Sequence, residues 1–119
     1  MSTWGYDIFD NDEANDIRAL FEAGLESGAS VAHATAEILR ESKDALDDPE
    51  AGPIVWLALA ALQLDRGELQ PNVRDHALAV IDSGADLKRW EEEGPPEDAA
   101  GRKRVLEELR ARLVASVQS

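Results

Sequence analysis

The sequence predicts an all-α protein, folded as a single compact bundle of five to six helices over residues 1–119. Apolar residues recur at helical spacing through most of the chain, and glycine or proline separates these amphipathic stretches. Only Val31 and Val73 begin β-friendly stretches, and the alanines around both favour helix. With 119 residues and 44% hydrophobic content, one domain of this size buries about two-thirds of its unfolded surface.

The first twelve residues form an aromatic segment that we expect to be ordered and packed on the bundle as a cap. Trp4, Tyr6 and Phe9 fall within six residues of a chain whose aromatic content is only 5%. Large aromatic side chains bury themselves against other groups. Gly5 fits a turn with positive φ, which residues with a Cβ atom resist.

The first helix is predicted to run from about residue 11 to residue 27 and to end at Gly28. Its N-cap is one of the three residues from Asp10 to Asp12, because these residue types favour helix starts. If Asp10 is the N-cap, Glu13 falls at N3, where its side chain completes a capping box.

A second helix starts after Ser30, which is a good N-cap, and fades in an acidic loop over residues 44–52. Pro53 fits the N1 position of a third helix, residues 54–66, which Gly67 ends. This helix is apolar all the way round, so we expect it to be the buried centre of the bundle. Its apolar run is shorter than the roughly 20 residues that cross a bilayer, so we expect no membrane span.

A fourth helix is predicted to begin at Pro71 and to end at Gly84. Asp86 can cap a short fifth helix that carries Trp90. The Gly-Pro-Pro stretch 94–96 stops that helix.

The last helix is predicted to open at Glu97 or Asp98 and to dock on the core through one apolar stripe. The stripe consists of Val105, Leu106, Leu109, Leu113 and Val117. Arg102 belongs to a group of basic residues on this helix that supplies most of the positive charge of the chain.

The net charge of −13 is unevenly distributed. Residues 1–50 carry thirteen Asp and Glu against three Lys and Arg, a net of −10, whereas residues 51–119 carry twelve against nine, a net of −3. An acidic field repels phosphate backbones, so nucleic-acid binding is disfavoured. It can attract a basic protein partner or a cation. The plainer alternative is that this surface keeps the protein soluble.

Cysteine is absent, which excludes a disulfide framework and a thiolate metal site. The first residues lack the basic and apolar regions of a secretory signal, so a cytoplasmic location is the default expectation. No glycine-rich phosphate loop occurs, and nucleotide binding by such a loop is unsupported.

The opening run has the pattern Trp4-Gly5-x-x-x-Phe9-Asp10-Asn11-Asp12-x-Ala14-x-Asp16. This pattern resembles the opening signature of a family of small bacterial proteins, domain-of-unknown-function family 4259. The resemblance covers nearly the whole chain, with a later stretch around Trp90 that is also similar. Asp7 stands where the family often has a second glycine, and Ile17 where it often has an aromatic residue. The resemblance implies a fold and a class and brings no activity with it.

Clustered carboxylates near the start of the first helix suggest a site for Mg²⁺ or Ca²⁺, which prefer oxygen ligands. The cluster comprises Asp7, Asp10, Asp12, Glu13 and Asp16. It does not fit an EF-hand, because the third ligand position counted from Asp10 falls on Ala14 and the twelfth on Phe21. Asp12 and Asp16 share one helix face and need a second helix to complete a site. Helix capping and complementarity to the helix dipole are the commoner explanation of such residues.

Histidines offer little chemistry. His33 and Glu37 form an i, i+4 pair that is commonly a solvated helix contact. His76 beside Asp75 could be a base oriented by a carboxylate, but no nucleophile is evident to pair with it. Because pocket, nucleophile, base and oxyanion donor are not visible as a set, we expect no enzyme activity and no cofactor.

Two tryptophans of the helical region also have alternative interpretations. Trp56 is expected in the core. Trp90 can pack inside, which is the commoner outcome, or pair with Trp4 as an aromatic lid over a binding surface.

The leading hypothesis is a non-enzymatic protein-interaction module whose acidic N-terminal half meets a basic partner, as an immunity or antitoxin-like protein would. Its candidate binding residues are Trp4, Asp10, Asn11, Asp12, Asp16 and Trp90, with Glu22 and Glu26 adding to the acidic face. The rival is a divalent-metal or small-ligand site on Asp7, Asp10 and Asp12, with His33 or His76 contributed from elsewhere. A third alternative is a homodimer formed through the last helix and Trp90.

Overall fold

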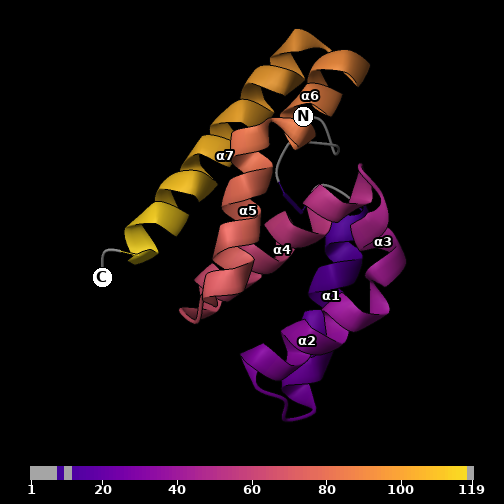
Figure 1. The fold of residues 1–119 in the computed structure, drawn as a ribbon, viewed down its shortest axis with the longest axis vertical. Helices are drawn as coiled ribbons and strands as arrows, with labels where there is room; N and C mark the ends of the chain where they lie inside the picture. The colour runs from indigo at the N-terminus through magenta and orange to yellow at the C-terminus, as the bar shows by residue number, and fades with distance from the viewer. Residues whose placement is uncertain (1–7, 10–11, 118–119) are drawn as a thin grey trace.

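Seven helices follow one another along the part of the chain that the computed structural model describes, residues 8–9 and 12–117 (Figure 1). They are α1 (Asp12–Glu26), α2 (Val31–Glu41), α3 (Lys43–Asp47), α4 (Ala51–Arg66), α5 (Pro71–Ser83), α6 (Ala85–Glu93) and α7 (Pro96–Val117). The described residues contain no strand, which confirms the all-α prediction. The predicted number of five to six helices is wrong, because α3 occupies part of the stretch expected to be an acidic loop.

The short helix α3 forms because its apolar side chains find a surface on α4. Ala45 and Leu46 are partly buried against the core. Gly52 brings the start of α4 close to them: a Cβ atom at Gly52 would lie only 2.8 Å from the carbonyl oxygen of Leu46. Gly52 is therefore a buried packing residue. Contact between these two segments, and not local periodicity, decides the structure of this stretch.

Helix α4 starts earlier than predicted, so Pro53 is not at N1. The extended backbone at Asp48 and its side chain give this residue the role of the N-cap. Its Oδ1 accepts hydrogen bonds from the N–H groups of Glu50 (2.7 Å) and Ala51 (3.1 Å). Pro49 lies in the turn that leads into α4, where its fixed φ is suited to a helix start. Pro53 still lies in the first turn, where N–H groups have no partner within the helix.

Most of the other predicted helix ends are confirmed. The Oγ atom of Ser30 accepts a hydrogen bond from the N–H of His33 (3.0 Å), as expected of an N-cap. Three of the four glycines predicted to end helices have positive φ, which only glycine adopts without strain. They are Gly28, Gly67 and Gly84, with φ values of 101°, 72° and 73°.

Two helices begin before the predicted residue. Helix α6 starts at Ala85, and Asp86 does not cap it but points inward, where it is 3% exposed. Helix α7 starts at Pro96 and not at Glu97 or Asp98. Proline is favoured at the first helical position, so the expected stop signal also serves as the next start signal.

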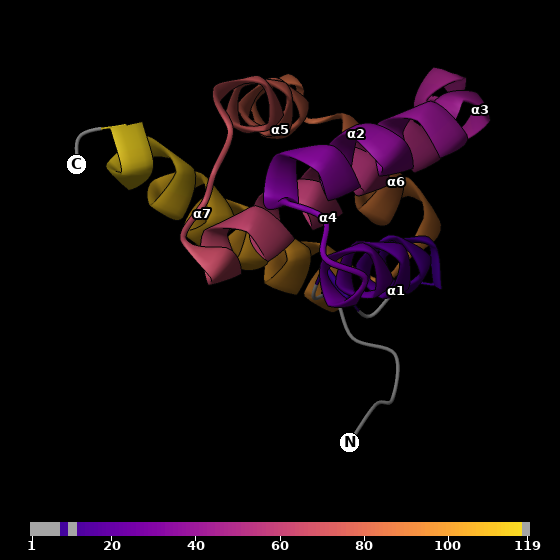
Figure 2. The same ribbon diagram turned by 90° about the horizontal axis from the view of Figure 1, so that it is seen from below.

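Helix α4 is the centre of the molecule. Its residues from Ile54 to Gln63 are buried except Trp56, and it contacts α1, α3, α5, α6 and α7. Seen from below, α5 and α1 lie on opposite sides of α4 (Figure 2). This position explains why α4 is apolar on every face, as predicted. No helix in residues 12–117 is both long and apolar enough to cross a membrane.

One polar side chain lies at the centre of the core. Gln63 is fully buried, and its Nε2 donates hydrogen bonds to Thr35 Oγ1 and Gln70 Oε1, each 2.9 Å long. Its Oε1 accepts the N–H of Gln70 (2.8 Å). The amide is thus satisfied, and it ties α4 to α2 and to the start of α5. A buried amide without such partners would be costly.

The aromatic segment predicted to cap the bundle is only partly described. Ile8 is buried in the hydrophobic core, and Phe9 is half-buried against it. The Nδ2 of Asn15 donates a hydrogen bond to the carbonyl oxygen of Phe9 (2.8 Å), which holds this turn on α1. Trp4 lies outside the described residues.

Candidate interaction surface

The predicted acidic site at the start of α1 is not brought together among the described residues. Asp12 and Asp16 are both exposed on α1. The other candidates, Trp4, Asp7, Asp10 and Asn11, lie outside the described residues. Within the described ranges, no three His, Asp or Glu side chains are arranged to hold a metal ion.

Three acidic side chains in the C-terminal half, those of Asp65, Asp82 and Asp86, pair with arginines of α7. Asp82 on α5 binds Arg110 on α7 (2.8 Å), and this hydrogen bond lowers the pKa of Asp82 and raises that of Arg110. Asp65 on α4 binds Arg112 on α7 (3.1 Å). Much of the positive charge of α7 is therefore used within the protein.

The N-terminal half contrasts with this pattern. Nine exposed acidic residues lie between residues 12 and 50: Asp12, Asp16, Glu22, Glu26, Glu41, Asp44, Asp47, Asp48 and Glu50. The same stretch has only three basic residues. Two of them pair with an acidic residue of their own helix: Arg18 with Glu22, and Arg40 with Glu37. The exposed side of α1, α2 and α3 is therefore strongly acidic. We call it the acidic face.

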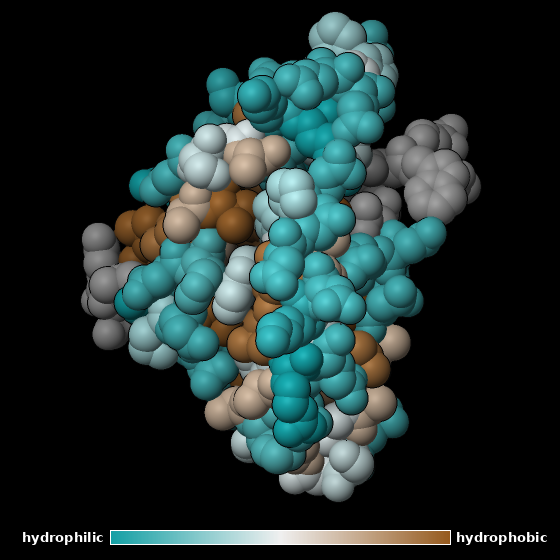
Figure 3. Space-filling model, turned by 45° about the vertical axis from the view of Figure 1, so that its right-hand side comes forward, coloured by the Kyte–Doolittle hydropathy of each residue, from teal (hydrophilic) through white to brown (hydrophobic). Residues whose placement is uncertain are grey.

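Two grooves flank α1. Hydrophilic residues cover most outward helix surfaces, and hydrophobic residues show mainly in the recesses between helices (Figure 3). The α1–α4 groove has a volume of about 560 Å³ and an apolar floor that includes Phe21 and Leu62. Its rim mixes charges, because two arginines and three acidic residues line it: Arg18, Arg66, Glu22, Glu26 and Asp65.

The α1–α2 groove lies on the other side of α1 and has a volume of about 540 Å³. Its lining combines apolar residues with two glutamates and one histidine. The lining includes Leu20, Gly24 and Ser27 on or next to α1, and His33, Ala34, Glu37, Ile38 and Glu41 on α2. Sequence reasoning missed this groove, because it depends on how closely α1 and α2 approach each other.

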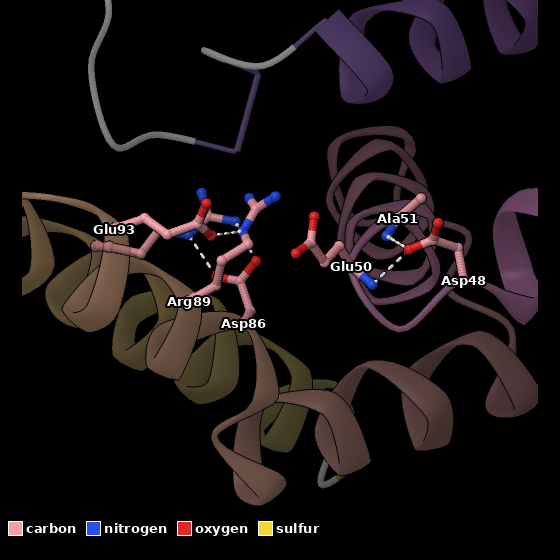
Figure 4. Close-up of polar contacts among 7 residues, drawn as sticks. Asp48, Glu50, Ala51, Asp86, Arg89 and Glu93 are labelled. Atoms are coloured by element: carbon pink, nitrogen blue, oxygen red, sulfur yellow. Dashed lines mark hydrogen bonds and ion pairs between the residues drawn. The ribbon is translucent and has the colours of Figure 1, made fainter.

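A third cleft, about 290 Å³ in volume, lies between the start of α4 and α6. Figure 4 shows Asp48 directed to the N–H groups that begin α4, with Asp86, Arg89 and Glu93 across the cleft. Those N–H groups lower the pKa of the Asp48 carboxyl. Asp86 binds Arg102, and Arg89 lies 4.0 Å from Glu93. These ionic groups compensate one another and require no ligand.

The histidines do not form a catalytic set among the described residues. The Nε2 of His33 lies 3.8 Å from Glu37, which confirms the predicted helix pair. The prediction that Asp75 orients His76 is wrong, because Asp75 pairs with Arg74. The His76 ring instead stacks on Trp56, with centroids 3.9 Å apart, and its Nδ1 lies 2.8 Å from the carbonyl oxygen of Asn72.

The tryptophans differ from the simple core prediction. Trp56 is only half-buried, because its ring covers the exposed His76. Trp90 is also half-buried, with its ring 5.4 Å from the Arg102 guanidinium, a cation–π distance. The Trp90 Nε1 atom is buried and has no hydrogen-bond partner within the described part of the chain. Pairing of Trp90 with Trp4 lies outside what is described.

Comparison with known proteins gives the family. The sequence profile of a domain of unknown function, DUF4259, matches residues 2–119. The chain belongs to this family. The resemblance inferred from the opening motif is thus confirmed, and the description of the family states no activity. No curated protein matches the chain, and no solved structure matches it.

Proposed function

We propose that this DUF4259 protein is a non-enzymatic binding module that recognises a basic protein partner through its acidic face. The observation that carries the proposal is the unequal use of charge. Asp65, Asp82 and Asp86 in the C-terminal half are each bound by an arginine of α7. The nine exposed acidic residues of the N-terminal half outnumber their three basic neighbours.

An uncompensated acidic face has two physical consequences for binding. It accelerates the encounter with a basic partner, because complementary fields steer diffusion. It also makes the interaction sensitive to salt, because ions screen exposed charges over about 8 Å at physiological ionic strength. A surface that serves solubility alone would show neither partner selectivity nor dependence on where the charges lie.

An immunity or antitoxin-like role in the cytoplasm would use these properties, since such a role requires a small protein to neutralise a basic partner. This part of the proposal rests on analogy of charge and shape. The absence of a paired nucleophile and base among the described residues supports a binding role over catalysis.

Affinity purification with two charge-matched variants tests the proposal. The first variant removes four of the nine negative charges of the acidic face, through Asp16→Asn, Glu22→Gln, Glu26→Gln and Glu41→Gln. The control makes the same change in charge elsewhere, through Glu68→Gln, Glu91→Gln, Glu107→Gln and Glu108→Gln, all exposed residues. We expect the wild type and the control to retain a basic partner in a salt-sensitive manner, and the first variant to lose it. Recovery of no partner, of acidic partners only, or equal loss in both variants would refute the proposal.

A further inference from the structure

The α1–α2 groove has the length and shape of a docking site for a helix. Leu20, Gly24 and Ser27 follow one another along its α1 side at i, i+4 and i+7. A row of this length spans about 10 Å, or two helical turns. Its floor is shallow and close-packed, because a Cβ atom at Gly24 would lie 3.2 Å from the Cβ of Ala34.

Leu20 gives this groove an apolar edge. Leu20 is 45% exposed, and it is the one large hydrophobic residue that stays exposed within residues 8–9 and 12–116. Ile38 on the opposite wall is buried. A partner side chain lying in the groove would therefore cover the exposed part of Leu20 and extend the existing core.

The acidic residues lie at one end of the groove. Asp16 stands one turn before Leu20 on the same face of α1, and Glu41 lines the groove at the end of α2. Neither forms an ion pair with any described residue. Glu37 is already engaged by His33 and Arg40, so it adds less attraction for a cation.

We infer that the α1–α2 groove binds an amphipathic helix of the basic partner. One row of its apolar side chains covers the exposed surface of Leu20 and lies along the groove over about two turns. Lysine or arginine residues beside that row face Asp16 and Glu41. This inference rests on the proposed function and specifies where on the acidic face the partner docks.

The α1–α4 groove and the cleft between α4 and α6 fit such an occupant less well. Arg18 and Arg66 offset most of the negative charge at the rim of the α1–α4 groove, so this rim attracts a basic helix less strongly. The cleft between α4 and α6 is lined by residues of both charges, and no large exposed hydrophobic residue of the described ranges lies in it. The α1–α2 groove alone among the three joins an exposed apolar edge to unpaired acidic residues in the described part of the chain.

The test uses designed peptides and the ¹⁵N-labelled full-length protein. The probe is a Leu/Lys peptide with leucines at helical spacing. One control is a Leu/Lys peptide of the same composition with scrambled order, and the other is a Leu/Glu peptide with the original spacing. We expect saturable shifts of backbone amide signals around Leu20, Gly24 and Ile38 with the probe, much weaker binding of the scrambled peptide, and none of the acidic peptide.

Variants then separate apolar from ionic contributions. Leu20→Gln should weaken binding of the probe about five- to tenfold, the effect of losing roughly half a buried leucine contact. Leu20→Met should keep most of the affinity of the wild type for the probe. Asp16→Asn with Glu41→Gln should weaken binding and lower its salt dependence. Asp44→Asn with Asp47→Asn on α3 changes the charge equally outside the groove and should have little effect.

The outcomes distinguish this inference from the proposed function. Equal binding of the ordered and scrambled Leu/Lys peptides, or shifts centred on α3, would overturn the groove as the docking site and leave the acidic face intact. Failure of every basic peptide to bind would overturn the groove and contradict the proposed function as well. Because Leu20 is exposed, its variants should keep the dispersed amide spectrum of the folded protein.

Discussion

Asp86 and Arg102 form a bidentate ion pair that is almost completely buried between α6 and α7. The Arg102 Nε lies 2.7 Å from Oδ2 of Asp86, and its Nη2 lies 3.1 Å from Oδ1. The side chain of Asp86 is 1% exposed and that of Arg102 is 4% exposed. A buried charge is tolerated when its partner satisfies it, so the pair fixes how α6 lies on α7.

Removal of one member of this pair should be strongly destabilising. We expect Asp86→Ala to lower the free energy of unfolding by about 3–5 kcal/mol, because it removes the carboxylate that binds the buried Arg102 charge through two hydrogen bonds. The double variant Asp86→Ala with Arg102→Met should lose much less than the sum of the single variants. Urea denaturation of the wild type, the two single variants Asp86→Ala and Arg102→Met, and the double variant measures these free energies. Additive losses would show that the two residues contribute independently.

Gly52 should resist replacement although it lies in a helix. An alanine there gains helix propensity of about 1 kcal/mol, but its Cβ meets the Leu46 carbonyl. Overpacking of this kind typically costs about 1–3 kcal/mol, so Gly52→Ala should lower the unfolding midpoint. Gly24→Ala, where the nearest atom is 3.2 Å away and belongs to a side chain, is the milder comparison. A rise in the midpoint for Gly52→Ala would contradict the packing role.

Asp48 should contribute to stability in a pH-dependent way. The N–H groups of Glu50 and Ala51 lower its pKa in the folded state. Its ionised form therefore stabilises the protein above the unfolded pKa of about 3.9, and this contribution disappears as the pH falls through the folded pKa.

Two variants check this effect. Asp48→Asn keeps a capping side chain without charge, so it should be less stable than the wild type at pH 7 and approach it at an acidic pH below the folded-state pKa of Asp48. Asp48→Ala should be less stable than Asp48→Asn at pH 7, because it has no capping group. Thermal unfolding at both pH values gives the comparison. A constant difference between the wild type and Asp48→Asn across this range would argue against the ionised cap.

The metal hypothesis for Asp7, Asp10 and Asp12 predicts a different experimental result from helix capping. Helix capping predicts that native mass spectrometry shows the polypeptide mass alone, unchanged by EDTA, and we expect this outcome. An excess mass that EDTA or Asp10→Asn removes would establish the metal site instead. The same spectrum determines whether a homodimer forms.

The sequence by itself determined the features that depend on a few neighbouring residues. Ser30 caps α2, Gly67 and Gly84 end helices, and α5 occupies residues 71–83 as predicted. These outcomes follow from local backbone preferences and short-range hydrogen bonds, which act within one or two turns. The burial of α4 was also predictable, because a helix that is apolar on every face is stable only inside the protein.

The tertiary structure decided the features that join distant segments. Asp86 meets Arg102 across 16 positions, and Gln63 reaches Thr35 across 28. Neither pairing has a local signal, because it depends on the angle and distance at which whole helices pack. The α1–α2 groove has the same origin: its residues are readable in the sequence, but their arrangement around an exposed Leu20 follows only from the close approach of two helices.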